Sequence, residues 1–170
     1  MSLFNGLPAH ILLVHFVVVL VPLTALALVV GVVWPGAARR MGVVLPLLAL
    51  VTLVSVPLTT GAGEWLQGHV DGNALVRRHA ELGDGLLPWV GGLFVLAVVV
   101  WWAAGRAAAS GVGASGGSRW SAVPVRVAAA VLTLGVASGA VVDVYRVGDS
   151  GAKAAWHDGF SKTASGSGGH

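Results

Sequence analysis

The chain has 170 residues, of which 56% are hydrophobic and only 10% are charged, and its mean hydropathy is +0.85. A water-soluble domain needs far more charge to cover its surface, so this composition indicates an integral membrane protein whose first partner is the lipid bilayer. The chain lacks cysteine and has a net charge of only +3, which excludes disulfides, thiolate metal sites and covalent haem, and argues against nucleic-acid binding.

Four apolar stretches are each long enough for the roughly 20 helical residues that cross a bilayer. The first covers about residues 9–34 and opens with Pro8, a residue suited to the start of a helix. The second covers about 42–62 and contains prolines, which membrane helices tolerate. The third covers about 82–105, after an amphipathic turn, and the fourth covers about 122–147. The sequence therefore predicts an all-α fold, an integral membrane four-helix bundle.

The fourth stretch carries Gly135 and Gly139 one helical turn apart, a spacing that lets another helix pack closely. The segment GRAAASGVGASGGSRW, between the third and fourth stretches, is typical of a flexible connector. Residues 159–170 have the low-complexity composition of a disordered tail. We therefore expect one membrane domain over residues 1–158.

Four spans place both termini on the same side of the membrane. Charge is distributed unequally between that side and the other one. The other side holds the connectors after the first and third spans, with basic residues and no acid: Arg39, Arg40, Arg106, Arg119 and Arg126. All 7 acids lie on the side of the termini: Glu64, Asp71, Glu81, Asp84, Asp143, Asp149 and Asp158. The side of the termini also holds five basic residues, Arg77, Arg78, Arg146, Lys153 and Lys162, so the count of basic residues alone is equal. Because the acid-free side has the more positive net charge, we place it in the cytoplasm and expect a multi-pass protein with both termini outside.

Histidines gather on the acid-bearing side, and His170 at the end of the tail is set aside. The others come from separate regions of the chain: His10, His15, His69, His79 and His157. Histidine is costly in hydrocarbon unless it is paired, so His15 needs a hydrogen bond, a proton relay or a metal. The pair His10 and His15 points roughly 140° apart on one helix, which argues against both binding one ion. Such histidines are either satisfied by neighbouring groups such as Glu64 or form a functional site.

Two kinds of cofactor fit this set of side chains. Estimated depths favour His10 over His15 as the partner of His79 on a haem b, in a pocket lined by Gly61, Gly63 and Gly83. A compact imidazole and carboxylate site would instead suit iron, copper or zinc, with His10, Glu64 and His79 as ligands. Elsewhere, we interpret Asp143 and Arg146 as a local pair near the membrane interface. No nucleophile elbow accompanies these residues, and the sequence leans away from an enzyme.

Four motifs in order resemble the bacterial membrane family called domain of unknown function 2231: GLPAHILLVHF, TTGAGEW, VRRHAELGD and GDSGAKAAW. The resemblance runs from Leu7 to about Trp156. In that family the first motif typically holds His-Pro and His-Phe-Pro, whereas Ile11 and Val17 stand at the proline positions here. The last motif usually reads Gly-His-Ser/Thr-Gly-Ala, and Asp149 replaces its histidine. An aspartate can bind a metal but is not an ordinary axial ligand of haem.

The resemblance implies a four-span domain of a bacterial plasma membrane without assigned chemistry. Some relatives join such a domain to a Rieske iron–sulfur module, which favours electron transfer by analogy. We therefore expect a cofactor near the outer face, either haem b bound by His10, His15 and His79, or a transition metal bound by His10, Glu64, His79 and Asp149. The protein would then transfer electrons or handle metal with a redox partner protein.

Two alternatives belong to other classes of function. The first is a non-catalytic membrane scaffold or accessory subunit whose histidines only form hydrogen bonds between helices. The second is a proton- or ion-conducting element, against which the sequence shows no ionisable residue in the central or inner half of any predicted span.

Overall fold

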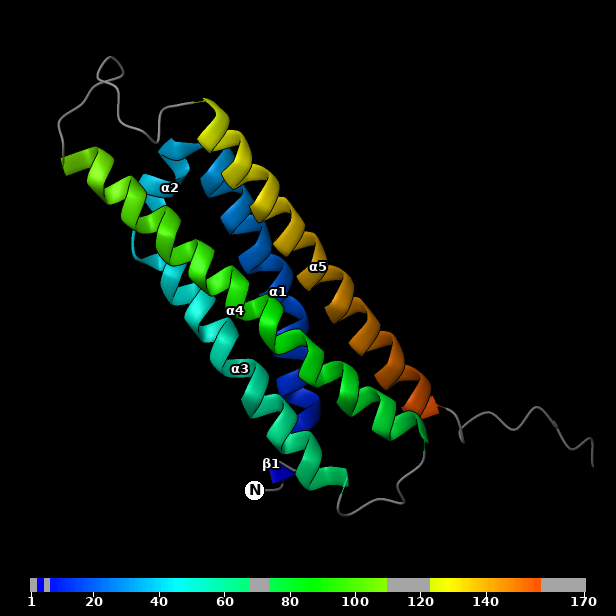
Figure 1. Cartoon of the computed structure of the whole chain (residues 1–170). Coiled ribbons are helices and arrows are strands. Elements are labelled where there is room, and N and C mark those ends of the chain that lie inside the picture. The colour runs from blue at the N-terminus through cyan, green and yellow to red at the C-terminus, as the bar shows by residue number, and fades with distance from the viewer. Residues whose placement is uncertain (1–2, 5–6, 68–73, 110–122, 157–170) are drawn as a thin grey trace, which may run out of the picture.

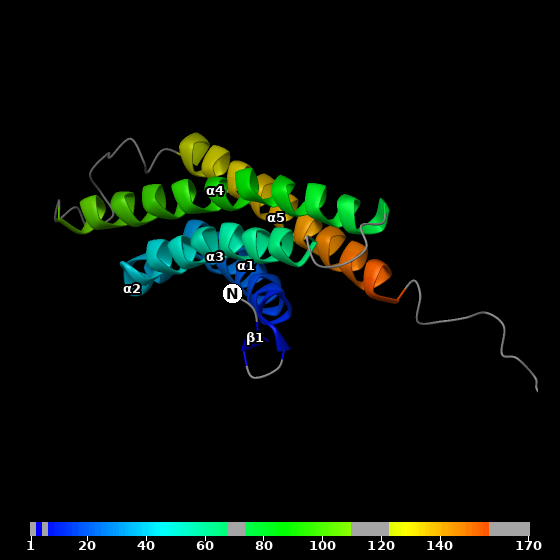
Figure 2. The same ribbon diagram turned by 90° about the horizontal axis from the view of Figure 1, so that it is seen from below.

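The computed structural model describes residues 3–4, 7–67, 74–109 and 123–156. The described elements, in chain order, are β1 (Leu3–Phe4), β2 (Leu7–Pro8), α1 (Ala9–Val33), α2 (Pro35–Met41), α3 (Val44–Gln67), α4 (Ala74–Ala109) and α5 (Val123–Trp156). The two short strands pair antiparallel ahead of α1. Figure 2 shows that this pair lies on the α1 side of the molecule, away from α4.

The four long helices form a closed ring in which each packs against two neighbours (Figure 1). Helix α1 lies between α3 and α5, and α4 closes the ring between the same two helices. Successive long helices run in opposite directions, so α1 begins and α5 ends at the same end of the bundle, here named the terminal end. At the opposite end, named the α2 end, the short helix α2 packs against α1 and α4.

Each long helix contains a segment that is long and apolar enough to cross a membrane. The candidate spans are Leu13–Val33 in α1, Val44–Gly63 in α3, Arg77–Ala109 in α4 and Val127–Lys153 in α5. The predicted all-α fold with four membrane-spanning helices is therefore confirmed.

Three helices are longer than the predicted spans. Helix α3 continues past residue 62 to Gln67. Helix α4 continues to Ala109, so residues 105–109 of the expected connector are helical, because alanine and arginine favour a helix. Helix α5 continues past Val147 to Trp156, so the motif GDSGAKAAW extends the helix. These three predicted boundaries are corrected. The rest of the connector and the predicted disordered tail lie outside the described residues.

The core consists of small and aliphatic side chains, and the outer surface is apolar as well. Val21, Leu28 and Ala97 have no exposed surface. Large apolar side chains also point outward, among them Leu26, which is 61% exposed, and Val131, which is 64% exposed. Helices that are hydrophobic all round are expected where the solvent is lipid rather than water.

Glycines let α4 and α5 pack closely along an interface that we name the α4–α5 seam. Each of these glycines lies opposite a larger side chain of the other helix, in the pairs Gly85 with Asp143, Gly139 with Trp89, and Gly92 with Val136. The contacting positions on α4 are 85, 89 and 92, and those on α5 are 143, 139 and 136. The spacings of four and three residues are the same on both helices and run in opposite directions, as expected for a regular antiparallel pair. The predicted close approach at Gly139 is confirmed, whereas a Cβ added at Gly135 would meet nothing within 4 Å.

A hydrogen bond between two threonines joins α1 to α3 inside the bundle. The Oγ1 atoms of Thr24 and Thr52 are 2.7 Å apart, and both residues are fully buried. Thr52 donates its own hydroxyl hydrogen to the carbonyl oxygen of Leu48 at 2.9 Å, so Thr24 is the donor to Thr52. Because no water reaches the hydrocarbon core, nothing replaces this bond if one hydroxyl is removed.

Replacing Thr24 or Thr52 with valine is expected to lower the free energy of unfolding by about 0.6–1.7 kcal/mol, because valine keeps the shape but not the hydroxyl. The double variant is expected to lose less than the sum of the two single losses, since neither hydroxyl then lacks its partner. Unfolding in mixed micelles, followed by circular dichroism, measures wild type and the three variants. Strictly additive losses would contradict a bond between the two hydroxyls.

Candidate functional site

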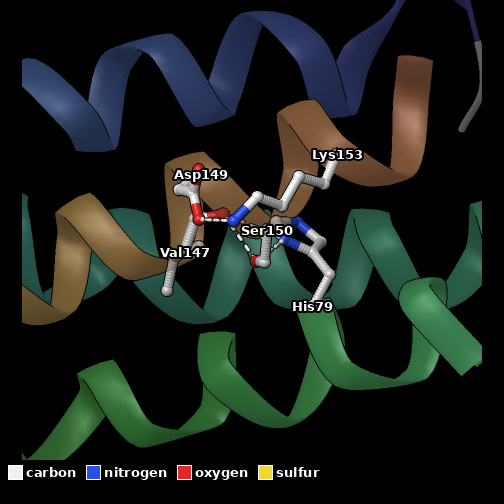
Figure 3. A network of polar contacts seen from close by, with 5 residues as sticks. All are labelled: His79, Val147, Asp149, Ser150 and Lys153. Carbon is white, nitrogen blue, oxygen red and sulfur yellow. Dashed lines mark hydrogen bonds and ion pairs between the residues drawn. The ribbon is translucent and has the colours of Figure 1, made fainter. Parts of the chain in front are cut away.

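The side chain of His79 connects α4 to α5 at the terminal end of the bundle. Its Nδ1 atom lies 3.1 Å from the carbonyl oxygen of Val147 and 3.0 Å from Oγ of Ser150 (Figure 3). Ser150 donates its hydroxyl hydrogen to the same carbonyl oxygen at 2.8 Å. Because a carbonyl oxygen can only accept, we infer that Nδ1 of His79 carries a proton and donates it toward Val147 and Ser150. In the neutral ring the lone pair is then on Nε2.

Gly151 on α5 leaves the space that the imidazole ring of His79 occupies. A Cβ added at Gly151 would lie 3.0 Å from Cε1 of His79, closer than side chains normally approach. Val147, Ser150 and Gly151 are three and four residues apart, so they share the face of α5 that meets α4. The last family-like motif, GDSGAKAAW, thus supplies the hydroxyl and the glycine that receive His79. The sequence reasoning did not assign these α5 residues to His79.

Asp149, the fourth predicted metal ligand, forms an ion pair on the exposed side of α5. One carboxylate oxygen lies 2.6 Å from Nζ of Lys153, one helical turn further on (Figure 3). The two side chains are 44% and 67% exposed, respectively. An exposed pair of this kind contributes about 0–1 kcal/mol to stability, and we therefore regard it as a minor local contact.

The remaining predicted ligands are only partly described. His15 lies on an exposed part of α1. The side chains of His10 and Glu64 lie outside the described part of the structure, so the prediction that they bind a metal or haem with His79 stays a prediction. Among the histidine and acidic side chains that the structure does describe, no three lie close enough together to hold a metal ion.

A pocket of about 220 Å³ lies between α3 and α4, one helix away from the His79 contact with α5. Its lining consists of Val56, Pro57, Thr60, Gly83, Asp84 and Leu87. Of the three glycines expected around a haem, only Gly83 lines it, and no histidine does. Its volume is below the roughly 300–1,000 Å³ typical of sites for small molecules and cofactors.

Asp143 faces α4 and makes no pair with Arg146, so this part of the sequence interpretation is wrong. Its Oδ2 atom is buried and has no hydrogen-bond partner among the described residues. A Cβ added at Gly85 would lie 3.7 Å from that atom, which shows that the carboxyl group points into the α4–α5 seam. Arg146 is exposed. The three-residue spacing along α5 would allow the pair with Arg146, but the contact with α4 decides where the carboxyl group points.

These observations define a four-span membrane bundle in which a histidine at the terminal end bridges two helices. Residues 6–164 match the family described as "Predicted membrane protein (DUF2231)", and the chain belongs to that family. The resemblance carried by the four sequence motifs is thereby confirmed over nearly the whole chain. No curated protein and no solved structure matches the chain.

Proposed function

We propose that this protein is a non-catalytic scaffold or accessory subunit of a bacterial plasma membrane, in which His79 fastens α4 to α5. The observation that carries the proposal is the position of Nδ1 of His79, which lies within hydrogen-bond distance of Val147 and Ser150, both on α5. A hydrogen bond between helices satisfies a polar side chain at the edge of the membrane without any cofactor.

Two features of the same region support a structural role for the histidine. The ring of His79 packs against Gly151, in the antiparallel arrangement that continues inward through the α4–α5 seam. Asp149 takes part in an ion pair with Lys153 at 2.6 Å. In this proposal the terminal end faces outward, because the connectors at the α2 end are basic and free of acids.

A second candidate is a haem b or transition-metal site that serves electron transfer or metal handling with a partner protein. One observation favours it: metal-binding histidines usually donate their second ring N–H to a carbonyl or carboxylate, as Nδ1 of His79 does to Val147. Iron, copper or zinc would then bind at Nε2, with further ligands from His10, His15, Glu64 and Asp149. The described residues fit this only in part, because they supply one oriented imidazole and no group of three ligands.

The cofactor content of the purified protein separates the two candidates. The cells should be supplied with iron, copper, zinc and a haem precursor, so that a missing cofactor cannot reflect a missing supply. We expect oxidised and dithionite-reduced spectra without a Soret band, and far less than one metal ion per chain. A Soret band with sharp reduced α and β bands, or one metal ion per chain, would overturn the scaffold proposal.

A further inference from the structure

The α2 end presents two adjacent arginines on a firmly packed short helix. Helix α2 lies against α1 and beside the last turns of α4 (Figure 1). Its Ala38 is buried, being only 2% exposed, whereas the neighbouring Arg39 and Arg40 are exposed. The side chain of Met41 also reaches α1, where a Cβ added at Gly31 would lie 3.3 Å from its Cε atom. Both guanidinium groups therefore project from a fixed support.

Within the described part of the chain, no acid lies at the α2 end to balance these two charges. Neither Arg39 nor Arg40 forms an ion pair with any residue that the structure describes. The acids within the described helices all lie toward the terminal end, as the order of the helices along the chain shows: Glu64, Glu81, Asp84, Asp143 and Asp149. In a buried or ion-paired arginine, the hydrogen-bond donors of the guanidinium are already used. The guanidinium groups of Arg39 and Arg40 can still donate to an anionic ligand.

Aromatic side chains mark this end as the level of the lipid headgroups. The guanidinium of Arg106, in the last turn of α4, lies 3.7 Å from the centre of the Trp102 ring. Trp102 is 49% exposed, and Trp34, just before α2, is 63% exposed. Exposed tryptophans at the ends of membrane helices lie at the boundary between hydrocarbon and headgroups. Arg39, Arg40 and Arg106 are therefore placed at the depth of lipid phosphates.

We propose that Arg39 and Arg40 bind the headgroup phosphate of an anionic phospholipid at the α2 end, where Arg106 in the last turn of α4 adds a further positive charge. A guanidinium donates two parallel hydrogen bonds to phosphate oxygens, which makes arginine a good phosphate ligand. A zwitterionic lipid carries its own cation next to the phosphate, so the uncompensated arginines select a lipid with net negative charge. The tryptophans favour a lipid in the bilayer over a free phosphate ion as the source of this group.

The terminal end offers a matched control for this proposal. Arg77 and Arg78 are also adjacent and exposed, and they begin the candidate span of α4. Acids lie nearby along the same helix, at Glu81 and Asp84. Arg77 and Arg78 therefore match Arg39 and Arg40 in side-chain type and in their position near the membrane edge. They differ in having carboxylates nearby on the same helix.

The test compares the full-length protein with Arg39→Gln/Arg40→Gln and Arg77→Gln/Arg78→Gln in nanodiscs of phosphatidylcholine with increasing phosphatidylglycerol. Retained phosphatidylglycerol is counted by native mass spectrometry. Loss of Arg39 and Arg40 is expected to weaken its apparent affinity roughly tenfold or more, and loss of Arg77 and Arg78 by about twofold at most. Helical content and the unfolding temperature in phosphatidylcholine alone are expected to stay unchanged, which separates lost binding from misfolding.

Three outcomes would overturn the proposal. Equal weakening in both double variants would show that any exposed arginine pair attracts the lipid, and no weakening in either would show that Arg39 and Arg40 do not bind it. Complete displacement of phosphatidylglycerol by inorganic phosphate would show an ion site rather than a lipid site.

Discussion

Replacing Gly139 with alanine is expected to lower the free energy of unfolding by about 1–3 kcal/mol, the usual cost of forcing extra atoms into a packed interface. A Cβ added at Gly139 would overlap the six-membered ring of Trp89, which contacts this glycine in the α4–α5 seam. The indole would have to leave its place or α5 would have to move away from α4. Unfolding in mixed micelles, followed by circular dichroism, measures the loss.

Gly135 provides the control, because it lies one turn away on the same helix and a Cβ there would meet nothing within 4 Å. Gly135→Ala is expected to be neutral, or stabilising by up to about 1 kcal/mol, since alanine favours a helix over glycine. Adding Trp89→Leu to Gly139→Ala should recover part of the loss, because the smaller side chain leaves room for the new methyl group. Equal effects at Gly139 and Gly135 would contradict the close approach of the two helices.

The second large effect is expected at His79. Substitution with asparagine or with glutamine distinguishes the role of Nδ1 from that of Nε2. The amide nitrogen of asparagine lies as many bonds from the backbone as Nδ1 of histidine, whereas that of glutamine lies further out, closer to Nε2. His79→Asn should keep the hydrogen bond to Val147. His79→Gln should lose it and lower the free energy of unfolding by about 0.6–1.7 kcal/mol more than His79→Asn does.

The same pair of variants also distinguishes the proposed structural role from a metal or haem site. Neither amide replaces an imidazole as a ligand of haem or of a transition metal, so a cofactor bound at His79 would be lost from both proteins. If stability depends on the hydrogen bond from Nδ1 of His79 to α5, the two variants differ in their free energy of unfolding. His79→Asn then stays close to wild type. Equal destabilisation by asparagine and glutamine would contradict the role that we assign to Nδ1.

The sequence predicted the four spans because hydropathy depends only on the order of residues along the chain. It also predicted the close approach at Gly139, since a glycine within an apolar helix leaves room for a neighbour. It could not predict that Trp89 fills this room, nor that Gly135 stays uncovered. Those facts depend on how far α4 is shifted and rotated against α5, and a pattern of apolar residues leaves both open.

The same limit explains what was missed around the histidine. His79 was recognised as a polar residue in need of a partner, but its partners, Val147 and Ser150, lie on another helix. Ser150 and Gly151 carry a recognisable signal, because they stand on the same face as Val147 within a conspicuous motif. Asp143 was assigned to Arg146 from spacing alone, and the α4–α5 seam overrides that spacing.

Cysteine cross-linking in native membranes tests the register of the α4–α5 seam most directly, and the tie made by His79 depends on that register. The chain has no cysteine of its own, so a pair introduced at Gly92 and Val136 reacts without background. A Cβ at Gly92 would lie 3.1 Å from Cγ1 of Val136, whereas a Cβ at Gly91 would meet nothing within 4 Å. The Gly91 and Val136 pair is therefore the matched control.

After mild oxidation we expect a disulfide-linked peptide, detected by mass spectrometry, from Gly92→Cys/Val136→Cys and not from Gly91→Cys/Val136→Cys, since disulfides form only between closely apposed Cβ atoms. Cross-linking of the Gly91 pair alone would contradict the account. It would mean that α4 is turned by about 100°, one residue of a helix, and that His79 then points away from α5.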